Sequence, residues 1–330
     1  MSFLSVCDLH VRFATEDGVV HAVNGLSFDL ERGRTLGIVG ESGSGKSVTS
    51  LAVLGLHDPR YTTLSGQIWL EDEDLLTLPE PRMERIRGRR VAMVFQDSLS
   101  SLSPFHTIGR QIGESFVKHT GASKREARER AIDLLQRVGI PRPELRVNAY
   151  PHEFSGGMRQ RAMIAMALVC DPALLIADEP TTALDVTVQA QILDLLKDIQ
   201  QQYGTAIILI THDLGVVAST ADDVLVMYAG RAVERGTTRE VLGSPRHPYT
   251  WGLLNSLPRL HSPLEEPLQP VRGTPPSLAD VPEGCAFHPR CDFVSLAVPG
   301  MCAGERPELS PHRGHADACY LTLTQKAALR

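Results

Sequence analysis

The sequence of 330 residues predicts an α/β fold with a helical insertion and an irregular C-terminal extension, and three observations lead to this expectation. A short apolar run at 35–39 opens through a loop rich in glycine and serine into a helical stretch. The runs at 173–178 and 206–210 are almost entirely apolar, as expected of parallel strands that are covered on both faces. Between them, residues 188–199 place apolar side chains on one face of a helix.

The first half of the chain supplies the remaining strands and the insertion. Residues 3–30 alternate between apolar and polar in short runs, the pattern of half-buried antiparallel strands. Further strands are predicted at 66–70 and 91–95, and from about residue 104 to 170 the pattern becomes helical.

Local signals define the ends of several helices and one hairpin. Ser123 and Glu126 form a capping box, in which each side chain satisfies a free N–H group at a helix start. Residues 222–236 are predicted to form a β-hairpin, and 248–257 a last helix. After Pro258 the chain is rich in Pro, Gly, His and Cys and shows no periodicity.

Composition and charge argue against a nucleic-acid-binding, a membrane-spanning and a secreted protein. The 33 basic and 39 acidic residues give a net charge of −6, so charge offers no argument for a nucleic-acid partner. No run reaches the roughly 18 apolar residues of a membrane-spanning helix. The N-terminal segment also lacks the basic and apolar regions of a secretory signal. We therefore expect a cytosolic chain that associates with a membrane only through partner proteins.

Residues 40–47, GESGSGKS, match the phosphate-loop pattern G-x-x-x-x-G-K-S/T. Glycines let backbone N–H groups turn toward phosphate oxygens, where a Cβ would obstruct the approach. The helix that follows adds the positive end of its dipole. The lysine would contact the β- and γ-phosphates, and the serine hydroxyl would ligate Mg²⁺. The alternative, a flexible loop with a surface lysine, is disfavoured because the match lies between a strand and a helix. The residues predicted to bind ATP here are Gly40, Ser42, Gly43, Gly45, Lys46 and Ser47.

Two adjacent acidic residues, Asp178 and Glu179, stand at the end of the apolar run at 173–178. Asp178 is placed to hold Mg²⁺ directly or through water. Glu179 can accept a proton from, or orient, the water that attacks the γ-phosphate. An acidic pair at a strand end is often merely structural, but its position downstream of a phosphate loop favours the catalytic interpretation.

The segment FSGGMRQR at 154–161 resembles the signature sequence of ABC ATPases, with Phe154 and Met158 where leucine and glutamine are usual. The resemblance implies that its three central residues contact nucleotide bound by an opposing subunit: Ser155, Gly156 and Gly157.

Four further residues resemble landmarks of the same family in the expected order. Gln96 resembles the glutamine that approaches Mg²⁺ and the attacking water, and His212 the histidine that hydrogen-bonds the γ-phosphate. Asp185, in the sequence ALD, resembles the loop that crosses the dimer interface. Phe13 resembles the aromatic residue that stacks on adenine.

The resemblance covers about residues 3–258 and implies a RecA-like core with an antiparallel β-subdomain and a helical signature subdomain at about 104–170. We accordingly predict a nucleotide-binding domain at 1–258 and a C-terminal extension at 259–330. The family binds ATP between two such subunits arranged head to tail. Because this chain has one set of motifs, it is expected to pair with itself or with a related ATPase, and to act on two transmembrane permease subunits.

The segment PRHPYTWGLLNSLP at 245–258 resembles the dipeptide, oligopeptide and nickel importer group. That resemblance implies import of di- and oligopeptides across a bacterial cytoplasmic membrane, with the chain bound peripherally to the cytoplasmic face. An extracytoplasmic solute-binding protein would be an indirect partner. The alternatives are transport of nickel or another solute, an ABC ATPase that acts outside transport, and a metal-binding regulatory module whose ATP site only signals.

Six cysteines in a reducing compartment are not expected to form disulfides. Cys7 and Cys170 lie within strand and helix patterns and are predicted to be core residues. Four thiolates suit an iron–sulfur cluster or zinc on grounds of ligand softness. The resemblance favours a 4Fe–4S cluster over zinc, and unligated buried thiols are the third interpretation. The four cysteines concerned are Cys285, Cys291, Cys302 and Cys319.

Overall fold

The computed structural model describes residues 2–16, 18–96, 101–182, 184–256, 270–312 and 314–329. They form two compact units, each assembled from separate stretches of sequence. Unit 1 comprises Met1–Leu4, Leu30–Thr35 and Leu70–Ile210, and unit 2 comprises Ser5–Asp29, Leu36–Trp69 and Thr211–Arg330. Within the described residues, no helix has the length and apolar character needed to cross a bilayer.

The parallel strands of unit 1 follow the order β6-β7-β8 and comprise Val91–Val94, Leu174–Asp178 and Ala206–Ile210. Every side chain of β7 and β8 is buried. Because a strand buried on both faces carries a continuous apolar run, these two segments confirm the sequence prediction. The register pairs Val94 with Ala177, which aligns the residues that follow β6 with those that follow β7.

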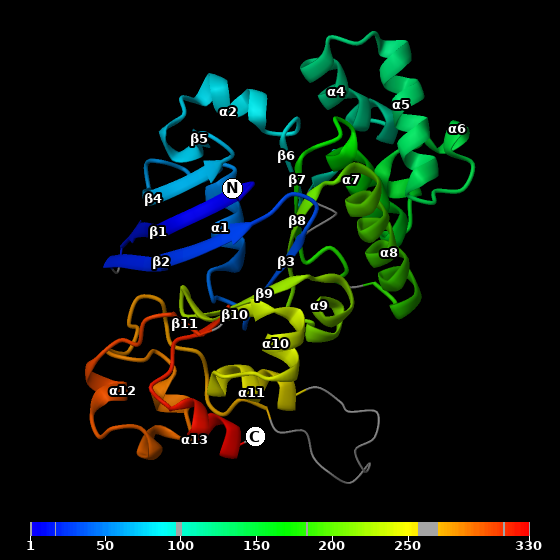
Figure 1. Cartoon of the computed structure of the whole chain (residues 1–330). Helices are drawn as coiled ribbons and strands as arrows, with labels where there is room; N and C mark the ends of the chain where they lie inside the picture. The colour runs from blue at the N-terminus through cyan, green and yellow to red at the C-terminus, as the bar shows by residue number, and fades with distance from the viewer. Residues whose placement is uncertain are drawn as a thin grey trace. The chain divides into compact units, whose positions relative to one another are not determined.

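The predicted helical insertion is confirmed by α4 (Ile108–Thr120), α5 (Lys124–Arg137) and α7 (Gly156–Leu168), which pack together in unit 1 (Figure 1). The capping box at Ser123 and Glu126 is formed as predicted. The amphipathic stretch at 188–199 lies in α8 (Val186–Tyr203). The other elements of unit 1 are β5 (Glu73–Asp74), η1 (Leu75–Thr77), α2 (Glu80–Ile86), α6 (Pro143–Arg146), η2 (Pro151–Glu153) and α8 (Val186–Tyr203).

Unit 2 contains most of a small sheet in the order β2-β1-β4, visible at the left of Figure 1. Its strands comprise Gly18–Leu30, Leu4–Thr15 and Thr62–Leu70. Along β1, Val6 and Leu9 are buried and Cys7 is exposed. The prediction that Cys7 is a core residue is therefore wrong, because its side chain points away from the face that Val6 buries.

A second group of strands in unit 2 follows the order β11-β12-β10-β9-β3. The predicted hairpin is confirmed by the antiparallel pair β9 and β10, and β3 runs parallel to β9. These strands comprise Ser310–His312, His315–Asp317, Arg231–Thr237, Asp223–Tyr228 and Thr35–Val39.

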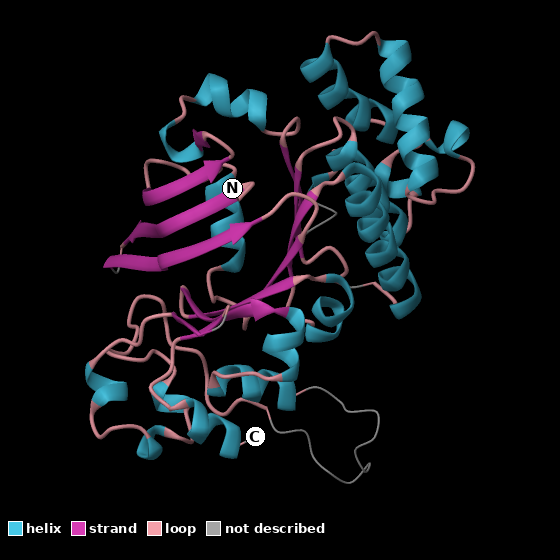
Figure 2. Ribbon diagram, viewed as in Figure 1, coloured by secondary structure: helices cyan, strands magenta, loops and turns pink. Residues whose placement is uncertain are grey.

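The C-terminal region, predicted to be irregular, contains short strands and helices between its loops. Strand β12 pairs antiparallel with β10, and short helices follow α11 (Pro248–Asn255) (Figure 2), so the helix predicted at 248–257 is not the last one. Elements of three to six residues are too short to show a period, which explains why the pattern was missed. The helices of unit 2 are α1 (Lys46–Val53), α9 (Leu214–Thr220), α10 (Thr238–Gly243), α11 (Pro248–Asn255), η3 (His288–Arg290), η4 (Val294–Leu296), α12 (Met301–Gly304) and α13 (Leu323–Ala328).

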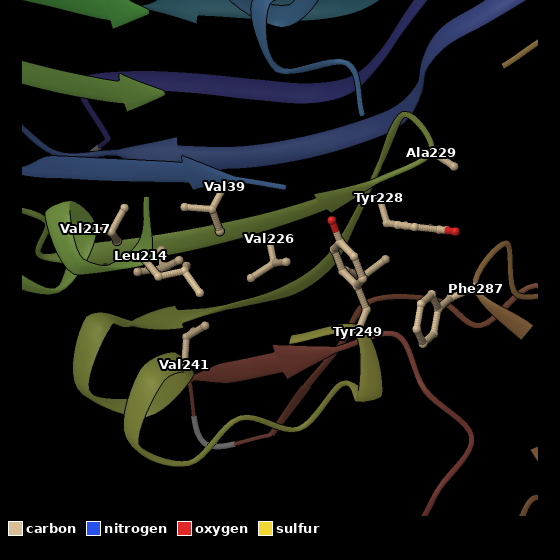
Figure 3. Close-up of a cluster of buried hydrophobic side chains, with 11 residues drawn as sticks. Val39, Leu214, Val217, Val226, Tyr228, Ala229, Val241, Tyr249 and Phe287 are labelled. Carbon is tan, nitrogen blue, oxygen red and sulfur yellow. The ribbon is translucent and has the colours of Figure 1, made fainter. Parts of the chain in front are cut away.

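Buried polar groups and an aromatic cluster join the C-terminal region to the rest of unit 2. The Glu234 carboxylate on β10 is fully buried and accepts hydrogen bonds from the His247 N–H (2.9 Å) and from His315 Nε2 (2.7 Å). Figure 3 shows Tyr249 and Phe287 at one end of the apolar cluster of this unit, beside Tyr228. A buried carboxylate is costly unless it is hydrogen-bonded, and one donor to Glu234 comes from the C-terminal region. The C-terminal region and the rest of unit 2 are therefore expected to fold together.

Candidate functional site

The phosphate loop joins β3 to α1 in unit 2. Gly45, the residue before α1, has a φ of 98°, and a Cβ there would lie 2.5 Å from the carbonyl oxygen of Ala22. Only glycine tolerates that conformation and that approach. Gly45 offers no side-chain cap to α1, and the N-terminus of a helix favours an anion.

Lys46 extends into this loop. Its side chain is mostly buried, and Nζ donates hydrogen bonds to the carbonyl oxygens of Gly40 (2.8 Å) and Glu41 (2.9 Å). Ser42 and Gly43 are exposed, and Ser47 is partly exposed. The ammonium group and the exposed backbone of the loop therefore lie together, as binding of a phosphate requires.

His212 lies at the same end of β3 as the phosphate loop. The Thr211 N–H donates to the carbonyl oxygen of Ile38 (3.2 Å), two residues before Gly40. On its other side, Asp213 caps α9 by accepting a hydrogen bond from the Gly215 N–H (2.8 Å). These bonds fix the backbone around His212, whose side chain is exposed.

Phe13 lies near the end of β1 and is half-buried. Its ring contacts His57 edge to face, with centroids 5.5 Å apart. His57 Nε2 in turn hydrogen-bonds the carbonyl oxygen of Val48 on α1 (2.9 Å). Phe13 is therefore connected to the helix that follows the phosphate loop.

Gln96 and Glu179 meet in unit 1. Because Val94 pairs with Ala177, the residues two positions further along each parallel strand fall side by side. Gln96 Nε2 donates to Glu179 Oε2 (2.9 Å), and Thr182 Oγ1 donates to the same oxygen (2.9 Å). The glutamine and the predicted catalytic carboxylate are thus in direct contact.

The backbone at Glu179 is strained. Its φ of 48° is unusual for a residue with a side chain, and its N–H donates to the carbonyl oxygen of Ile210 (2.8 Å). Asp178, the last residue of β7, is buried. Strain of this kind persists only where surrounding contacts hold it, and it concentrates at functional sites.

The signature segment begins α7 in unit 1. Ser155 caps the helix by accepting a hydrogen bond from the Met158 N–H (3.3 Å), and Ser155 and Gly156 are exposed. A Cβ on Gly157 would lie 3.0 Å from Val188 on α8. Phe154 is buried, which explains why this apolar residue can stand where leucine is usual.

Asp185 is exposed, and it caps α8 by accepting a hydrogen bond from the Val188 N–H (2.9 Å). Ala183, in the same motif, lies outside the described residues.

The predicted ATP-site residues form two sets, one in each unit. Unit 2 contains the phosphate loop, His212 and Phe13, and unit 1 contains the other predicted ATP-site residues: Gln96, Ser155, Gly156, Gly157, Asp178, Glu179 and Asp185.

Sequence reasoning missed an ion pair that a C-terminal arginine makes with the phosphate loop. Arg290 donates two hydrogen bonds to the carboxylate of Glu41, at 2.6 and 3.0 Å. The only signal was the basic residue in HPRC beside Cys291, and a partner 249 positions away left no pattern in the sequence.

The four C-terminal cysteines line one cavity of about 20 Å³, which holds about one water molecule. Burial raises the pKa of Cys285 to about 11 and that of Cys319 to about 12, and it also raises the pKa of Cys291 and Cys302. Among the residues that the structure describes, no group of three or more His, Cys, Asp or Glu side chains is placed to hold a metal ion. The predicted metal site is thus not preformed, since buried neutral thiols are poor ligands until a metal displaces their protons.

Two protein families match the chain. The ABC transporter family matches residues 23–182, and the family described as oligopeptide/dipeptide transporter, C-terminal region, matches residues 233–297. The first range contains the phosphate loop, the signature segment and the acidic pair. The second contains Arg290 and two of the four cysteines.

Several relatives cover most of the chain. The oligopeptide transport ATP-binding protein OppD of Bacillus subtilis is 56% identical over 88% of this chain and 82% of its own length. The protein of the same name from Salmonella typhimurium is 54% identical over 96% of this chain and 93% of its own length. The dipeptide transport ATP-binding protein DppD of Bacillus subtilis is 53% identical over 87% and 86%.

A solved structure shows the same fold. The ATP-binding cassette MJ0796, solved as a dimer in a post-hydrolysis state bound to ADP and Pi, is 26% identical to this chain. It aligns with a TM-score of 0.65 over 72% of this chain and 99% of that one. The α/β ABC ATPase fold is therefore confirmed, and the chain belongs to the ATP-binding proteins of the ABC transporter family, in the group that carries the oligopeptide/dipeptide transporter C-terminal region.

Proposed function

We propose that this chain binds and hydrolyses ATP to energise import of di- and oligopeptides by an ABC transporter. The contact between Gln96 and Glu179 carries the proposal for hydrolysis, because it aligns a carboxylate with the glutamine that resembles the one approaching the attacking water. The relatives support the choice of solute, since their names specify oligopeptide and dipeptide transport. Nickel or another solute is the alternative.

The phosphate loop would bind the β- and γ-phosphates of ATP through its backbone N–H groups and through Lys46. His212 would donate a hydrogen bond to the γ-phosphate, and Phe13 would stack on adenine. Mg²⁺ would neutralise charge that develops on the phosphates during transfer, and Ser47 in unit 2 and Asp178 and Gln96 in unit 1 each offer an oxygen ligand for it. These residue types fit the ion, which prefers oxygen ligands.

Glu179 would act as the general base or would orient the attacking water. Gln96 and Thr182 both donate to one oxygen of the Glu179 carboxylate, so they hold it in a defined orientation. A fixed carboxylate reduces the entropy lost when the water reaches its position for in-line attack.

The exposed positions of Ser155 and Gly156 support a second ATPase subunit as the partner. Their hydroxyl and N–H groups at the start of α7 would contact nucleotide bound by that subunit, which is either a second copy of this chain or a related one. Two transmembrane permease subunits would hold the pair at the cytoplasmic face of the membrane, and a solute-binding protein would act on the other side.

Anaerobic purification of the tagged chain from its native membranes tests the proposed assembly. We expect two multi-span membrane proteins and an ATPase subunit to be recovered with it, in near-equal amounts by mass spectrometry. Recovery of ribosomes or nucleic acid in their place would contradict the transport function and favour an ABC ATPase that acts elsewhere.

For the C-terminal cysteines we infer a 4Fe–4S cluster in preference to zinc. Four thiols line one cavity, which supports a four-cysteine ligand set, and this cavity of about 20 Å³ has to open to admit four iron and four sulfide ions. Each thiolate of such a set ligates a different iron atom, so the sulfurs need not converge on one point as zinc requires. Cys285, Cys291, Cys302 and Cys319 would supply the ligands.

Replacing Cys285 and Cys319 together with serine is expected to remove the broad visible absorbance of the anaerobically purified chain and its bound iron. The matched control is the pair Cys7→Ser and Cys170→Ser, whose residues do not line the cavity. Iron analysis and the visible spectrum are the measurements. A wild-type chain that contains no iron, or a control pair that loses it, would contradict the inference.

A further inference from the structure

The seven-residue turn from Cys285 to Cys291 carries Arg290 to the phosphate loop within unit 2. The Arg290 guanidinium donates to both oxygens of Glu41, at 2.6 and 3.0 Å, and to Tyr228 Oη at 3.2 Å. Its Nε donates to the carbonyl oxygen of Arg272 (2.7 Å). The side chain is only 5% exposed, whereas that of Glu41 is 26% exposed. The pair is thus bidentate, and the guanidinium is almost removed from water.

The same C-terminal region also holds the backbone of Glu41. The Glu41 N–H donates to Tyr249 Oη (2.8 Å) on α11, and the Tyr249 ring packs against Tyr228 and Phe287. The Glu41 carbonyl oxygen accepts a hydrogen bond from Lys46 Nζ (2.9 Å). A single residue of the phosphate loop is therefore fixed at its N–H, at its side chain and at the carbonyl that contacts the ATP-binding lysine.

Internal contacts hold the turn that carries Arg290. The Cys285 N–H donates to the carbonyl oxygen of Cys302 (2.8 Å), and the His288 N–H donates to that of Cys285 (2.8 Å). Phe287 is buried in the apolar cluster of unit 2. The hydrogen bond to Cys302 and the burial of Phe287 anchor the turn. The turn can therefore hold the Arg290 guanidinium against the phosphate loop without a large loss of conformational entropy.

We propose that Arg290 is a positioning residue for ATP binding, which holds the phosphate loop in its binding conformation through Glu41. The inference rests on the proposed function, since it presupposes that this loop binds ATP. Transporter ATPases that carry this C-terminal region would then use the region to set their affinity for nucleotide. Phosphate-binding loops depend on a preformed array of N–H groups, so a loop released at Glu41 must be ordered by the ligand itself.

Equilibrium titration of the purified full-length chain with a fluorescent ATP analogue tests the role of Arg290. Arg290→Ala is expected to weaken binding about ten-fold, the usual effect of losing a hydrogen bond to a charged group. The ATP affinity of Arg290→Lys is expected to lie between those of the wild-type chain and Arg290→Ala, since lysine keeps the charge but not the bidentate geometry. At saturating ATP the hydrolysis rate should stay within about two-fold of wild type, because the residue affects binding and not the attacking water.

A double-mutant cycle separates this role from general damage to the fold. Glu41→Ala should weaken ATP binding as much as Arg290→Ala, and the double variant should be no weaker than either single variant. Arg272→Ala is the control, because that exposed side chain pairs with Asp292 and does not contact the loop. If Arg290→Ala lowers the melting temperature, Glu41→Ala decides the outcome, since Glu41 is partly exposed.

Lys46→Ala distinguishes failure of this inference from failure of the proposed function. Loss of binding in Lys46→Ala with wild-type affinity in Arg290→Ala and Glu41→Ala would overturn the positioning role and leave the ATP site intact. Wild-type affinity in Lys46→Ala would overturn the proposed function itself. Additive effects in the cycle would also contradict a role that acts through Glu41.

Discussion

Replacing Glu179 with glutamine is expected to slow ATP hydrolysis roughly 10²–10⁴-fold, the usual contribution of a general base. The glutamine side chain has nearly the same shape and can still contact Gln96 and Thr182, which now hold the carboxylate. It cannot accept a proton from the attacking water. ATP affinity should be unchanged or tighter, because the variant binds nucleotide without removing the γ-phosphate. Steady-state phosphate release and a nucleotide titration measure the two effects.

Glu129→Gln is a matched control for that experiment. Glu129 is an exposed carboxylate on α5, in the same unit as Glu179, and its replacement should change neither rate nor affinity. If Glu179→Gln hydrolyses ATP at the wild-type rate, the catalytic assignment is wrong, and the interpretation of the chain as a regulatory module gains support.

Replacing Lys46 with alanine is expected to weaken ATP binding about 100-fold or more. The Lys46 ammonium is buried in the loop and bonded to the carbonyl oxygens of Gly40 and Glu41, so removing it leaves carbonyl dipoles facing the phosphates of the ligand. Titration with the fluorescent ATP analogue measures the loss.

Lys118→Ala, at an exposed position on α4, removes the same charge at a site that no binding residue occupies. It should bind ATP as the wild-type chain does. The two variants can thus be told apart, since Lys46→Ala loses ATP binding and Glu179→Gln loses only ATP hydrolysis. A Lys46 variant that binds ATP normally would exclude the loop as the phosphate site.

The main secondary structure was predictable wherever the pattern was long enough. The buried strand at Leu174–Asp178 follows from a continuous apolar run, and the helix at Val186–Tyr203 follows from apolar periodicity. The roles proposed for Lys46 and Glu179 come from residue type and local motif, so they could be predicted without a structure.

Contacts between distant residues could not be predicted in this way. The meeting of Gln96 with Glu179 depends on strand register, which motif order does not specify. The pairing of Arg290 with Glu41 joins positions 249 residues apart, and only the tertiary fold brings them together. The face on which Cys7 lies, likewise, is decided by the pleat of β1 and not by residue type.

ATP-dependent uptake of peptide by membrane vesicles that contain the purified complex tests the central claim most directly. With ATP supplied on the side that carries this chain, we predict accumulation of labelled di- or oligopeptide by the wild-type complex and none by the complex with Glu179→Gln. Equal uptake by both complexes, or ATP hydrolysis by the wild-type complex without peptide uptake, would contradict the account.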